Sequence, residues 1–403
     1  MLINQLSLEQ DVIEWTEEQR ALRDRFRQWH GTFSENHIAN DQAGSFARDA
    51  WQAVMKSGIL RLPFAREWGG LEQDLLTTLY VLEDLGRGCR DGGLSFSIST
   101  QICSTGIPLQ RYGSDELKAR YLSRICEGSA ITAHAISEPQ GGSDAMSMQT
   151  TATDEGDHFV LDGRKVFVSL GPVADLIVVY ARTDNQPPPF GITAFIVERD
   201  TPGLTIGPSI AKMGTRTSPF CELSFIDCKV PTGNIIGKRN SGFVVFDHVL
   251  KWEILCSFMI TTGEMQHRLE RCIEFARTRK QFGQAIGAFQ SVSNKIVEMK
   301  IATETARKWL YDTAEKFAAD ANVTTDIAIS KLVVSEGNIA SALSAIQIFG
   351  GRGYLTEYGL EKDLRDAVGG AIYSGTSEIQ RQRVAAMLGL TKKNIRAPDV
   401  PEK

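Results

Sequence analysis

The sequence has neither a paired-cysteine pattern nor a cluster of residues spaced as a metal site. Its seven cysteines are odd in number and scattered, without a CxxC motif or a Cys/His cluster. Reduced, mostly buried thiols of this kind are typical of a cytoplasmic protein. We therefore expect cytoplasmic localisation and no metal ion. The cysteines are Cys89, Cys103, Cys126, Cys221, Cys228, Cys256 and Cys272.

Long apolar runs and clustered basic residues are also missing. No run approaches the roughly 18 apolar residues that cross a bilayer, and Glu9, Asp11 and Glu14 stand where a signal peptide would be apolar. The chain has 44 Lys and Arg against 49 Asp and Glu, a net charge of −5. Non-specific binding to nucleic acid needs clustered cations. We expect neither a membrane nor a nucleic-acid partner.

The chain lacks the strand–helix alternation of a doubly wound sheet and has no GxGxxG motif after a strand, which argues against a Rossmann-type cofactor site. Its pattern changes instead from helical to β and back to helical. We predict an N-terminal α-helical domain (1–128), a middle β domain (129–238), a C-terminal helical bundle (239–390) and a flexible tail (391–403).

The two helical regions show a clear period. Segments 17–29, 46–57 and 75–85 repeat apolar residues every three or four positions, and Asp115 is predicted to cap the helix that follows it. Between Val292 and Leu310 the apolar positions follow a four-three spacing. This stripe predicts a long helix that packs into a bundle.

The middle region has strand character. The runs 176–181, 191–198 and 221–230 are short and rich in branched and aromatic residues, and Pro, Gly and Asn separate them. Asp162-Gly163, flanked by apolar residues, predicts a two-residue hairpin turn. Together these signals predict a β-sandwich or a barrel-like domain.

Three local patterns could carry chemistry, although each also has a purely structural interpretation. The first, ISEPQGGSD (136–144), is a turn whose glycines allow close approach of a ligand. The second, ARTRKQFG (276–283), is a basic helix end that could hold a phosphate or simply be closed by Gly283. The third combines QIFGGRGY (347–354) with YSGTSEIQ (373–380), which could mark a tight turn and a helix cap.

Taken together and in this order, the patterns resemble the acyl-CoA dehydrogenase family over roughly residues 15 to 390. The family's elements are T/S-E-P-x-x-G-S-D, K-x-W/F-x-T/S, R-K-x-F-G, Q-x-x-G-G-x-G-Y/F and G-T-x-E/Q-I. The resemblance implies an α+β multidomain fold with an N-terminal helical domain, a middle β-barrel or sandwich domain and a C-terminal four-helix bundle. It also implies FAD as the cofactor.

The resemblance assigns the flavin contacts residue by residue. It places the isoalloxazine ring beside the 136–144 turn, under the aromatic residue and the hydroxyl of KVFVS (165–169). A partner subunit would grip the rest of FAD, which implies a homo-oligomer, expected to be a tetramer. The implied contacts are Ile136, Ser137, Gly142, Ser143, Phe167, Ser169, Arg279, Gln281, Phe282, Gln290, Gln347, Gly351, Thr376 and Glu378.

The reaction of such enzymes needs a carboxylate that removes the α-proton of an acyl thioester in a dry pocket. Many family members carry it in Tyr-Glu-Gly-Thr, which reads Tyr373-Ser374-Gly375-Thr376 here. Isovaleryl- and long-chain-type members carry it 26 positions before the first Arg of R-K-x-F-G. Counting back from Arg279 gives Glu253. Glu253 is therefore the predicted base, and the alternative is an exposed helix glutamate.

The substrate contacts that the resemblance implies are Ser143, Trp252, Tyr373, Ser374 and Gly375. The backbone N–H of Ser374 would polarise the thioester carbonyl, as in an oxyanion hole. Relatives often have Arg and Asp where this chain has Ile254 and Lys251, near the thioester carrier. These differences leave open whether the acyl group is linked to CoA or to a carrier protein.

Two other classes of function stay open at this level. One is a flavin monooxygenase or oxidase on the same fold, and the other is a non-catalytic flavoprotein. The electron acceptor implied by the resemblance is an electron-transferring flavoprotein or molecular oxygen.

Overall fold

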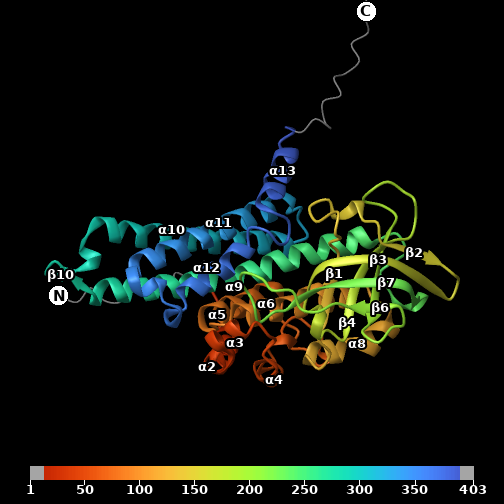
Figure 1. The fold of residues 1–403 in the computed structure, drawn as a ribbon, viewed down its shortest axis with the longest axis horizontal. Coiled ribbons are helices and arrows are strands. Elements are labelled where there is room, and N and C mark those ends of the chain that lie inside the picture. The colour runs from red at the N-terminus through yellow and green to blue at the C-terminus, as the bar shows by residue number, and fades with distance from the viewer. Residues whose placement is uncertain (1–12, 391–403) are drawn as a thin grey trace, which may run out of the picture.

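The computed structural model describes residues 13–390, in which helices are followed by a sheet and then by helices again (Figure 1). The predicted tail, 391–403, lies outside the described residues. The N-terminal part folds as short helices that end before the sheet. They are α1 (Glu17–Arg27), α2 (His30–Ser34), α3 (His37–Ala43), α4 (Arg48–Ser57), α5 (Leu75–Gly88), α6 (Gly92–Thr100), the π-helix η3 (Gln101–Gly106), α7 (Ile107–Tyr112) and α8 (Asp115–Glu127).

Local capping explains where several of these helices begin. The side chain of Thr16 accepts a hydrogen bond from the backbone of Gln19, whose own side chain returns to Thr16, a capping box at α1. The predicted cap of α8 was off by one residue. Ser114 caps that helix by accepting from Leu117, and Asp115 is its first residue. There the carboxylate faces the positive end of the helix dipole.

The middle domain is one mixed sheet in the order β6-β7-β3-β2-β4-β5-β8, with β1 paired to β4. β1 runs parallel to β4, whereas β4 and β5 are antiparallel. The strands are β1 (Thr132–Ala135), β2 (Thr151–Asp154), β3 (His158–Ser169), β4 (Leu176–Arg182), β5 (Ile192–Glu198), β6 (Leu204–Ile206), β7 (Phe220–Pro231) and β8 (Ile235–Ile236).

The sheet folds over its own core, as the predicted sandwich or barrel requires. Phe159 of β3 meets Phe195 of β5 with ring centroids 5.2 Å apart, although the two strands are not neighbours in the sheet. Successive residues of β4 alternate between this core and a second one beneath α8. Both faces of β4 are therefore buried, which explains its unbroken apolar run.

The hairpin predicted at Asp162-Gly163 is wrong. Both residues lie within β3, and the pairing with β7 shifts register between Leu161 and Gly163. Gly163 has φ 150°, and a Cβ there would meet the backbone of Thr150 at 2.7 Å. Gly163 thus forms a bulge inside a long strand, where the absence of a side chain lets the Thr150 backbone come close, and it does not form a turn.

The C-terminal part is a helical bundle whose long helices lie side by side (Figure 1). Its stripe prediction is confirmed, since Met299, Thr303, Ala306 and Leu310 are all buried on α10. The helices are α9 (Gly242–Thr278), α10 (Gln290–Ala318), α11 (Thr324–Phe349), α12 (Leu360–Gly369) and α13 (Ser377–Met387).

Gly283 does not close a helix. α9 ends at Thr278 and is followed by a small hairpin of β9 (Lys280–Gln281) and β10 (Gln284–Ala285). Phe282 and Gly283 form its turn with φ of 50° and 80°. Both φ values are positive, as in the tight turns that join two antiparallel strands.

One helix, α11 with the turn that follows it (Thr324–Tyr354), is long and apolar enough to cross a membrane by length and composition alone. It packs within the bundle against α9, α10 and α13. All seven cysteines are free and buried, as predicted. Within residues 13–390, no three His, Cys, Asp or Glu side chains are grouped so that they could hold a metal ion.

Helix α9 is fixed against α5 by glycines on both helices. A Cβ on Gly86 would lie 1.8 Å from the carbonyl oxygen of Ile260, and one on Gly263 would lie 1.9 Å from that of Glu83. The two backbones are thus in direct contact. Any side chain at either position would push the helices apart, and with them every residue that α9 carries.

We therefore predict that Gly86→Ala lowers the free energy of unfolding by about 1–3 kcal/mol or more, because the added methyl overpacks this contact. Thermal unfolding measures the change. The matched control is Gly31→Ala on the short helix α2, where an added Cβ meets nothing within 4 Å. Equal melting temperatures for the two variants would show that the α5–α9 contact is not the tight constraint described here.

Candidate active site

Glu253 lies near the start of α9 and is bonded to the predicted substrate turn. Its carboxylate accepts a hydrogen bond from the hydroxyl of Ser374, 121 positions later in the chain. The structure therefore brings together the predicted base and the serine that stands at the base position of many relatives. The alternative of an exposed helix glutamate is wrong, since Glu253 is only partly accessible and faces this turn.

The surroundings of Glu253 are dry. Buried Cys103 of η3 donates to the backbone carbonyl of Trp252 at 3.6 Å, and Ile254, Leu255 and Cys256 are completely buried. Burial raises the pKa of Glu253, and the hydrogen bond from Ser374 opposes part of this rise. A carboxylate with a raised pKa is a stronger base than one in water, as abstraction of a weakly acidic proton requires.

The turn that carries Ser374 is held in a left-handed conformation. Ser374 and Gly375 have φ of 53° and 83°, and Gln380 donates to the carbonyl of Ser374 at 2.8 Å. The side chain of Thr376 then caps α13 by accepting from Ile379. This geometry aims the Ser374 hydroxyl at Glu253.

The Ser374 backbone N–H has no hydrogen-bond acceptor among residues 13–390. A free N–H beside a partly buried carboxylate is the arrangement that an enolising thioester needs, with one group to take the proton and one to bind the oxygen. The substrate role of Ser374 stays a prediction. The structure adds the side-chain contact to Glu253, which the sequence interpretation missed.

The predicted flavin-side loop follows β1 and is anchored beneath by a buried ion pair. Glu138 accepts from Lys165 of β3 at 2.8 Å, and it also accepts from the backbone N–H groups of Gln149 and Thr150. Val166 donates to the carbonyl of Ser137 at 2.9 Å. Ile136 and Ser137 therefore lie against the segment of β3 that carries the other predicted flavin contacts.

A bulge turns Phe167 out of the sheet. The register with β7 shifts between Lys165 and Val168, and Phe167 itself has φ 56°. Its ring is 67% exposed. A phenylalanine held in a strained conformation and turned to solvent indicates a ligand surface.

The open side of this region has room for a planar ring. A Cβ on Gly142 would meet nothing within 4 Å, and the exposed Ser143 lies beside it. The Ser169 hydroxyl has no hydrogen-bond partner in the described part of the chain. The exposed ring, the open glycine loop and the free hydroxyl fit the FAD edge that the resemblance implies.

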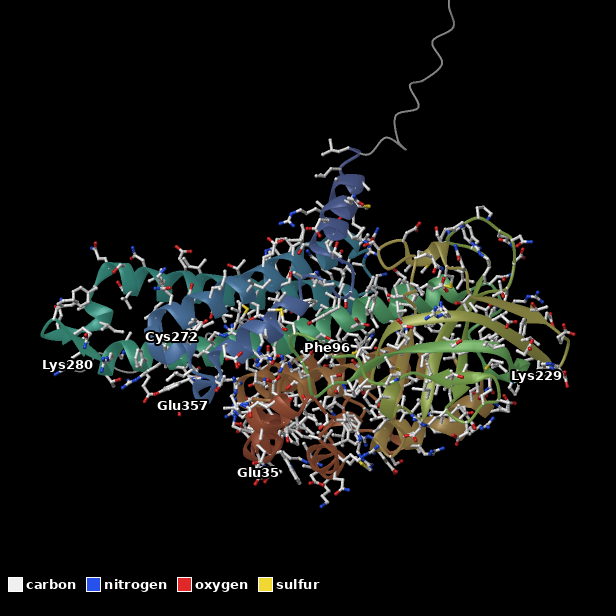
Figure 2. All side chains as sticks on the ribbon, viewed as in Figure 1. Glu35, Phe96, Lys229, Cys272, Lys280 and Glu357 are labelled. Atoms are coloured by element: carbon white, nitrogen blue, oxygen red, sulfur yellow. The ribbon has the colours of Figure 1, made fainter. Side chains whose placement is uncertain are left out.

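The remaining predicted flavin contacts fall into two places. Thr376 and Glu378 follow Ser374 directly at the start of α13. The others lie far from the sheet, at the opposite end of the bundle, in the β9–β10 hairpin, at the start of α10 and around the end of α11. Figure 2 shows Lys280 of that hairpin at one end of the molecule and Lys229 of the sheet at the other. One chain therefore does not bring the two groups together. The distant contacts are Arg279, Gln281, Phe282, Gln290, Gln347 and Gly351.

The other predicted substrate contacts are only partly open to a ligand. Trp252 packs against the main core, and Tyr373 packs against Phe96 with ring centroids 5.2 Å apart. Ile254 is completely buried, so it offers no surface to a thioester carrier. Lys251 is paired with Asp247 at 2.6 Å. Whether the acyl group is linked to CoA or to a carrier protein therefore stays open at these two positions.

Comparison of this chain with known proteins shows which family it belongs to. The chain matches the acyl-CoA dehydrogenase N-terminal domain over residues 16–129, the middle domain over 133–228 and the C-terminal domain over 240–389. It is 39% identical over 342 residues to an L-prolyl-[peptidyl-carrier protein] dehydrogenase from Serratia sp. (strain ATCC 39006), covering 85% of this chain and 89% of that protein.

Two solved structures are similar throughout. The prolyl acyl carrier protein oxidase AnaB superposes with a TM-score of 0.91 at 41% identity, covering 94% of this chain and 100% of that one. PigA with FAD and proline also gives 0.91, at 35% identity, covering 94% and 99%.

The chain belongs to the acyl-CoA dehydrogenase family. It is an FAD-dependent oxidoreductase that dehydrogenates acyl thioesters, the class that its fold and the Glu253 site define. The family assignment and FAD as cofactor confirm the sequence analysis.

One signal in the sequence pointed to the missed Ser374 contact. In this chain a hydroxyl stands where many relatives have the catalytic carboxylate, and a second carboxylate is the predicted base. A hydroxyl at the first position can donate a hydrogen bond to a carboxylate that serves the same pocket. The sequence interpretation considered Ser374 and Glu253 separately, because residues 121 positions apart give no local sign that they are in contact.

We predict that removing the Ser374 hydroxyl moves the acidic limb of the pH profile of flavin reduction upward by about one pH unit. The hydroxyl donates to the ionised form of Glu253 and so lowers its pKa, and its loss raises that pKa further. Ser374→Gly suits the left-handed backbone and Ser374→Ala does not, yet both lack the hydroxyl. Equal shifts support the hydrogen bond, whereas a shift in the alanine variant alone would assign the effect to backbone strain.

Proposed function

We propose that the protein dehydrogenates the α,β-bond of an acyl or aminoacyl group carried on the phosphopantetheine arm of a carrier protein, with Glu253 as the base. The observation that carries the catalytic assignment is the hydrogen bond between Ser374 and Glu253, which fixes a desolvated carboxylate beside a free backbone N–H.

The roles of the chain follow from this geometry. Glu253 removes the α-proton, and the Ser374 N–H binds the thioester oxygen as negative charge develops on it. FAD, when bound, supplies N5 as the acceptor of the β-hydrogen and its electron pair. Phe167 and Ser169 would cover the flavin ring and donate to its edge. The α-proton and the β-hydride leave together, so the substrate loses two electrons and gains a double bond.

A carrier-protein tether is supported by similarity. The Serratia relative is a dehydrogenase of a prolyl group on a peptidyl carrier protein, and AnaB is a prolyl acyl carrier protein oxidase. The exposed β9–β10 hairpin at the end of the bundle supports a homo-oligomer, which we propose to be a tetramer. Phe282 is 94% exposed in a left-handed turn, and a second chain could bring it to the distant half of FAD.

Two further points rest on the family resemblance and on the reduced cysteines. We propose that an electron-transferring flavoprotein takes the electrons from the reduced enzyme and that the protein works in the cytoplasm. Its seven free buried thiols fit a reducing compartment.

The test is anaerobic bleaching of flavin absorbance by matched thioesters. Each acyl group, prolyl included, is offered both as its CoA ester and on a phosphopantetheinylated carrier protein. We expect faster bleaching by the carrier-bound series. Equal or faster bleaching by CoA esters would overturn the carrier assignment. A requirement for an added reductant would make the protein a monooxygenase, and no reaction at all would remove the enzyme assignment.

Glu253→Gln should retain FAD and slow flavin reduction by about 10²–10⁴-fold, because the amide cannot accept the α-proton. Stopped-flow absorbance measures the rate, and bound FAD is quantified from the visible spectrum. The control is Glu315→Gln, the same chemical change at an exposed site on α10. Bleaching within tenfold of the wild-type rate would rule out Glu253 as the base.

Arg279→Ala should lower FAD retention if the hairpin of one subunit completes the flavin site of another, because an exposed guanidinium is available for the pyrophosphate. Cofactor content and mass in solution are measured together. The comparison variant is Arg164→Ala, whose side chain pairs with Glu222 on the surface of the sheet. Full FAD occupancy in an Arg279→Ala monomer would contradict a shared site.

A further inference from the structure

Lys331 of α11 is a completely buried lysine whose ammonium group forms no hydrogen bond or ion pair within residues 13–390. The other buried lysines, Lys165 and Lys362, each donate to a carboxylate, at 2.8 and 2.7 Å. The Lys331 ammonium instead lies over the ring of Phe258, 5.9 Å from its centroid. A cation–π contact at that distance offsets only part of the cost of burying a charge.

Two further buried polar atoms without a hydrogen-bond partner in the described part of the chain lie at the start of α13. They are Oγ of Ser377 and Oε1 of Gln380. These residues form the buried side of α13, and α13 packs on α11, the helix that carries Lys331. Glu378 and Arg381 of α13 are among the charges that act on Lys331. The ammonium, the hydroxyl and the amide oxygen therefore lie at the same junction between the two helices.

Gln380 connects this junction to the turn that carries Ser374. Its Nε2 donates to the Ser374 carbonyl at 2.8 Å, and a Cβ on Gly375 would lie 2.8 Å from the same nitrogen. The amide thus packs directly against the left-handed turn. The two ends of an amide differ mainly in their hydrogen bonding, so a donor at Oε1 is what keeps Nε2 on the Ser374 carbonyl.

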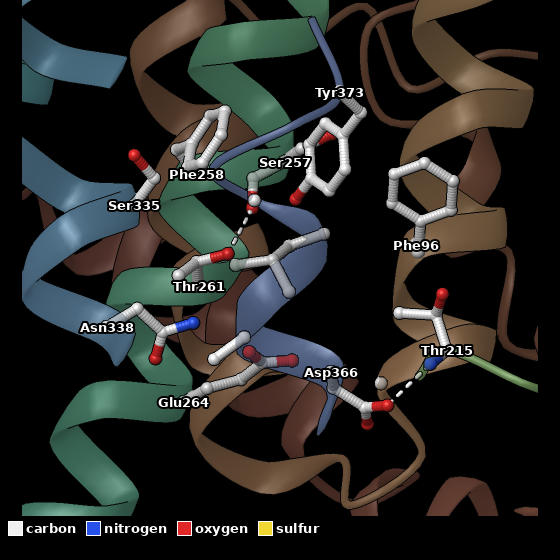
Figure 3. A pocket seen from close by; sticks show the side chains of 14 residues that line it. Phe96, Thr215, Ser257, Phe258, Thr261, Glu264, Ser335, Asn338, Asp366 and Tyr373 are labelled. Carbon is white, nitrogen blue, oxygen red and sulfur yellow. Dashed lines mark hydrogen bonds between the residues drawn. The ribbon is translucent and has the colours of Figure 1, made fainter. Parts of the chain in front are cut away.

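A second connection runs through aromatic rings. Phe258, which the Lys331 ammonium faces, stacks on Tyr373 at the start of the same turn, with ring centroids 5.5 Å apart. Figure 3 shows Phe258 next to Tyr373 on one side and Ser335 of α11 on the other. Ser335 follows Lys331 by about one helical turn. Lys331 is therefore linked to this turn both through Phe258 and through the junction with α13.

We propose that Lys331 is a positioning residue, whose ammonium orients the Gln380 amide through one shared buried water molecule and so holds the Ser374 N–H in place for the thioester oxygen. The three unpartnered atoms at the junction are the number of partners that a buried water takes. This inference rests on the proposed function, because that function assigns the thioester oxygen to the Ser374 N–H. Lys331 touches neither the substrate nor FAD in this role.

Lys331→Met removes the charge and keeps most of the length of the side chain. We expect flavin reduction at saturating thioester to slow at least about tenfold, since losing one oxyanion donor outright costs about 10²–10³-fold. Binding of the thioester should change little. The melting temperature should stay equal or rise, because a buried charge without an acceptor is removed.

The matched control is Lys308→Met, the same change at an exposed site on α10, which should behave as wild type. A melting temperature of Lys331→Met that falls together with the rate would make Lys331 merely structural and would overturn the proposal.

The pH profile gives a signature that a structural role would not produce. Burial lowers the pKa of Lys331 to about 8, and Glu336 and Glu378 offset part of this fall, whereas Arg381 adds to it. Glu336 is itself paired with Arg381 at 2.6 Å, and the Phe258 ring on α9 is uncharged. Lys331 loses its charge as the pH rises through about 8. Flavin reduction should therefore fall there in the wild-type protein, and this limb should be absent in Lys331→Met.

A double-mutant cycle tests whether Lys331 acts through Gln380. Lys331→Met should slow flavin reduction at least about tenfold in the wild-type background and have little effect in Gln380→Leu, because coupled residues show non-additive effects. Additive effects of the two substitutions would show that the lysine acts elsewhere and would contradict the proposal.

Amide hydrogen exchange gives a readout that needs no substrate. In FAD-loaded protein, the segment 371–377 should exchange faster in Lys331→Met than in the wild-type protein or in Lys308→Met, with exchange in the sheet unchanged. Equal exchange in all three proteins would overturn the inference. If exchange responds as expected but no thioester reduces the flavin of the wild-type protein, the proposed function fails and the hold of Lys331 on the turn stands.

Discussion

The contact between α5 and α9 is the constraint on which the rest of the structure depends. α9 is a 37-residue helix that touches the N-terminal helices, strand β5 and the bundle. Gly86 and Gly263 let its backbone lie directly on that of α5. Because α9 carries Glu253 and packs against the N-terminal helices, the sheet and the bundle, its placement sets the position of the predicted base relative to all three. A shift of α9 would move Glu253 away from Ser374, which lies outside this helix.

The predicted base, Glu253, is on α9 and not in the turn before α13, where many relatives carry theirs. The residue at position 374 has a hydroxyl instead of a carboxyl group, yet it still reaches the same space and donates to Glu253. The left-handed turn at Ser374 and Gly375 keeps a backbone N–H free at that point. In the proposed mechanism, proton abstraction and oxygen binding are therefore separable functions, the first on α9 and the second in the turn before α13. This separation would let the base stand on either element while the polarising N–H stays in place.

Much of the fold could be predicted because its signals are local. The stripe from Met299 to Leu310 needs only the helical period, and the apolar run of β4 needs only its length and composition. Asp162-Gly163 failed because a glycine in a bulge and a glycine in a hairpin turn look alike in sequence. Only the neighbouring Thr150 backbone, which no local pattern reveals, separates them. Glu253 could be placed by counting from Arg279, but its bond to Ser374 could not, since 121 positions separate the two.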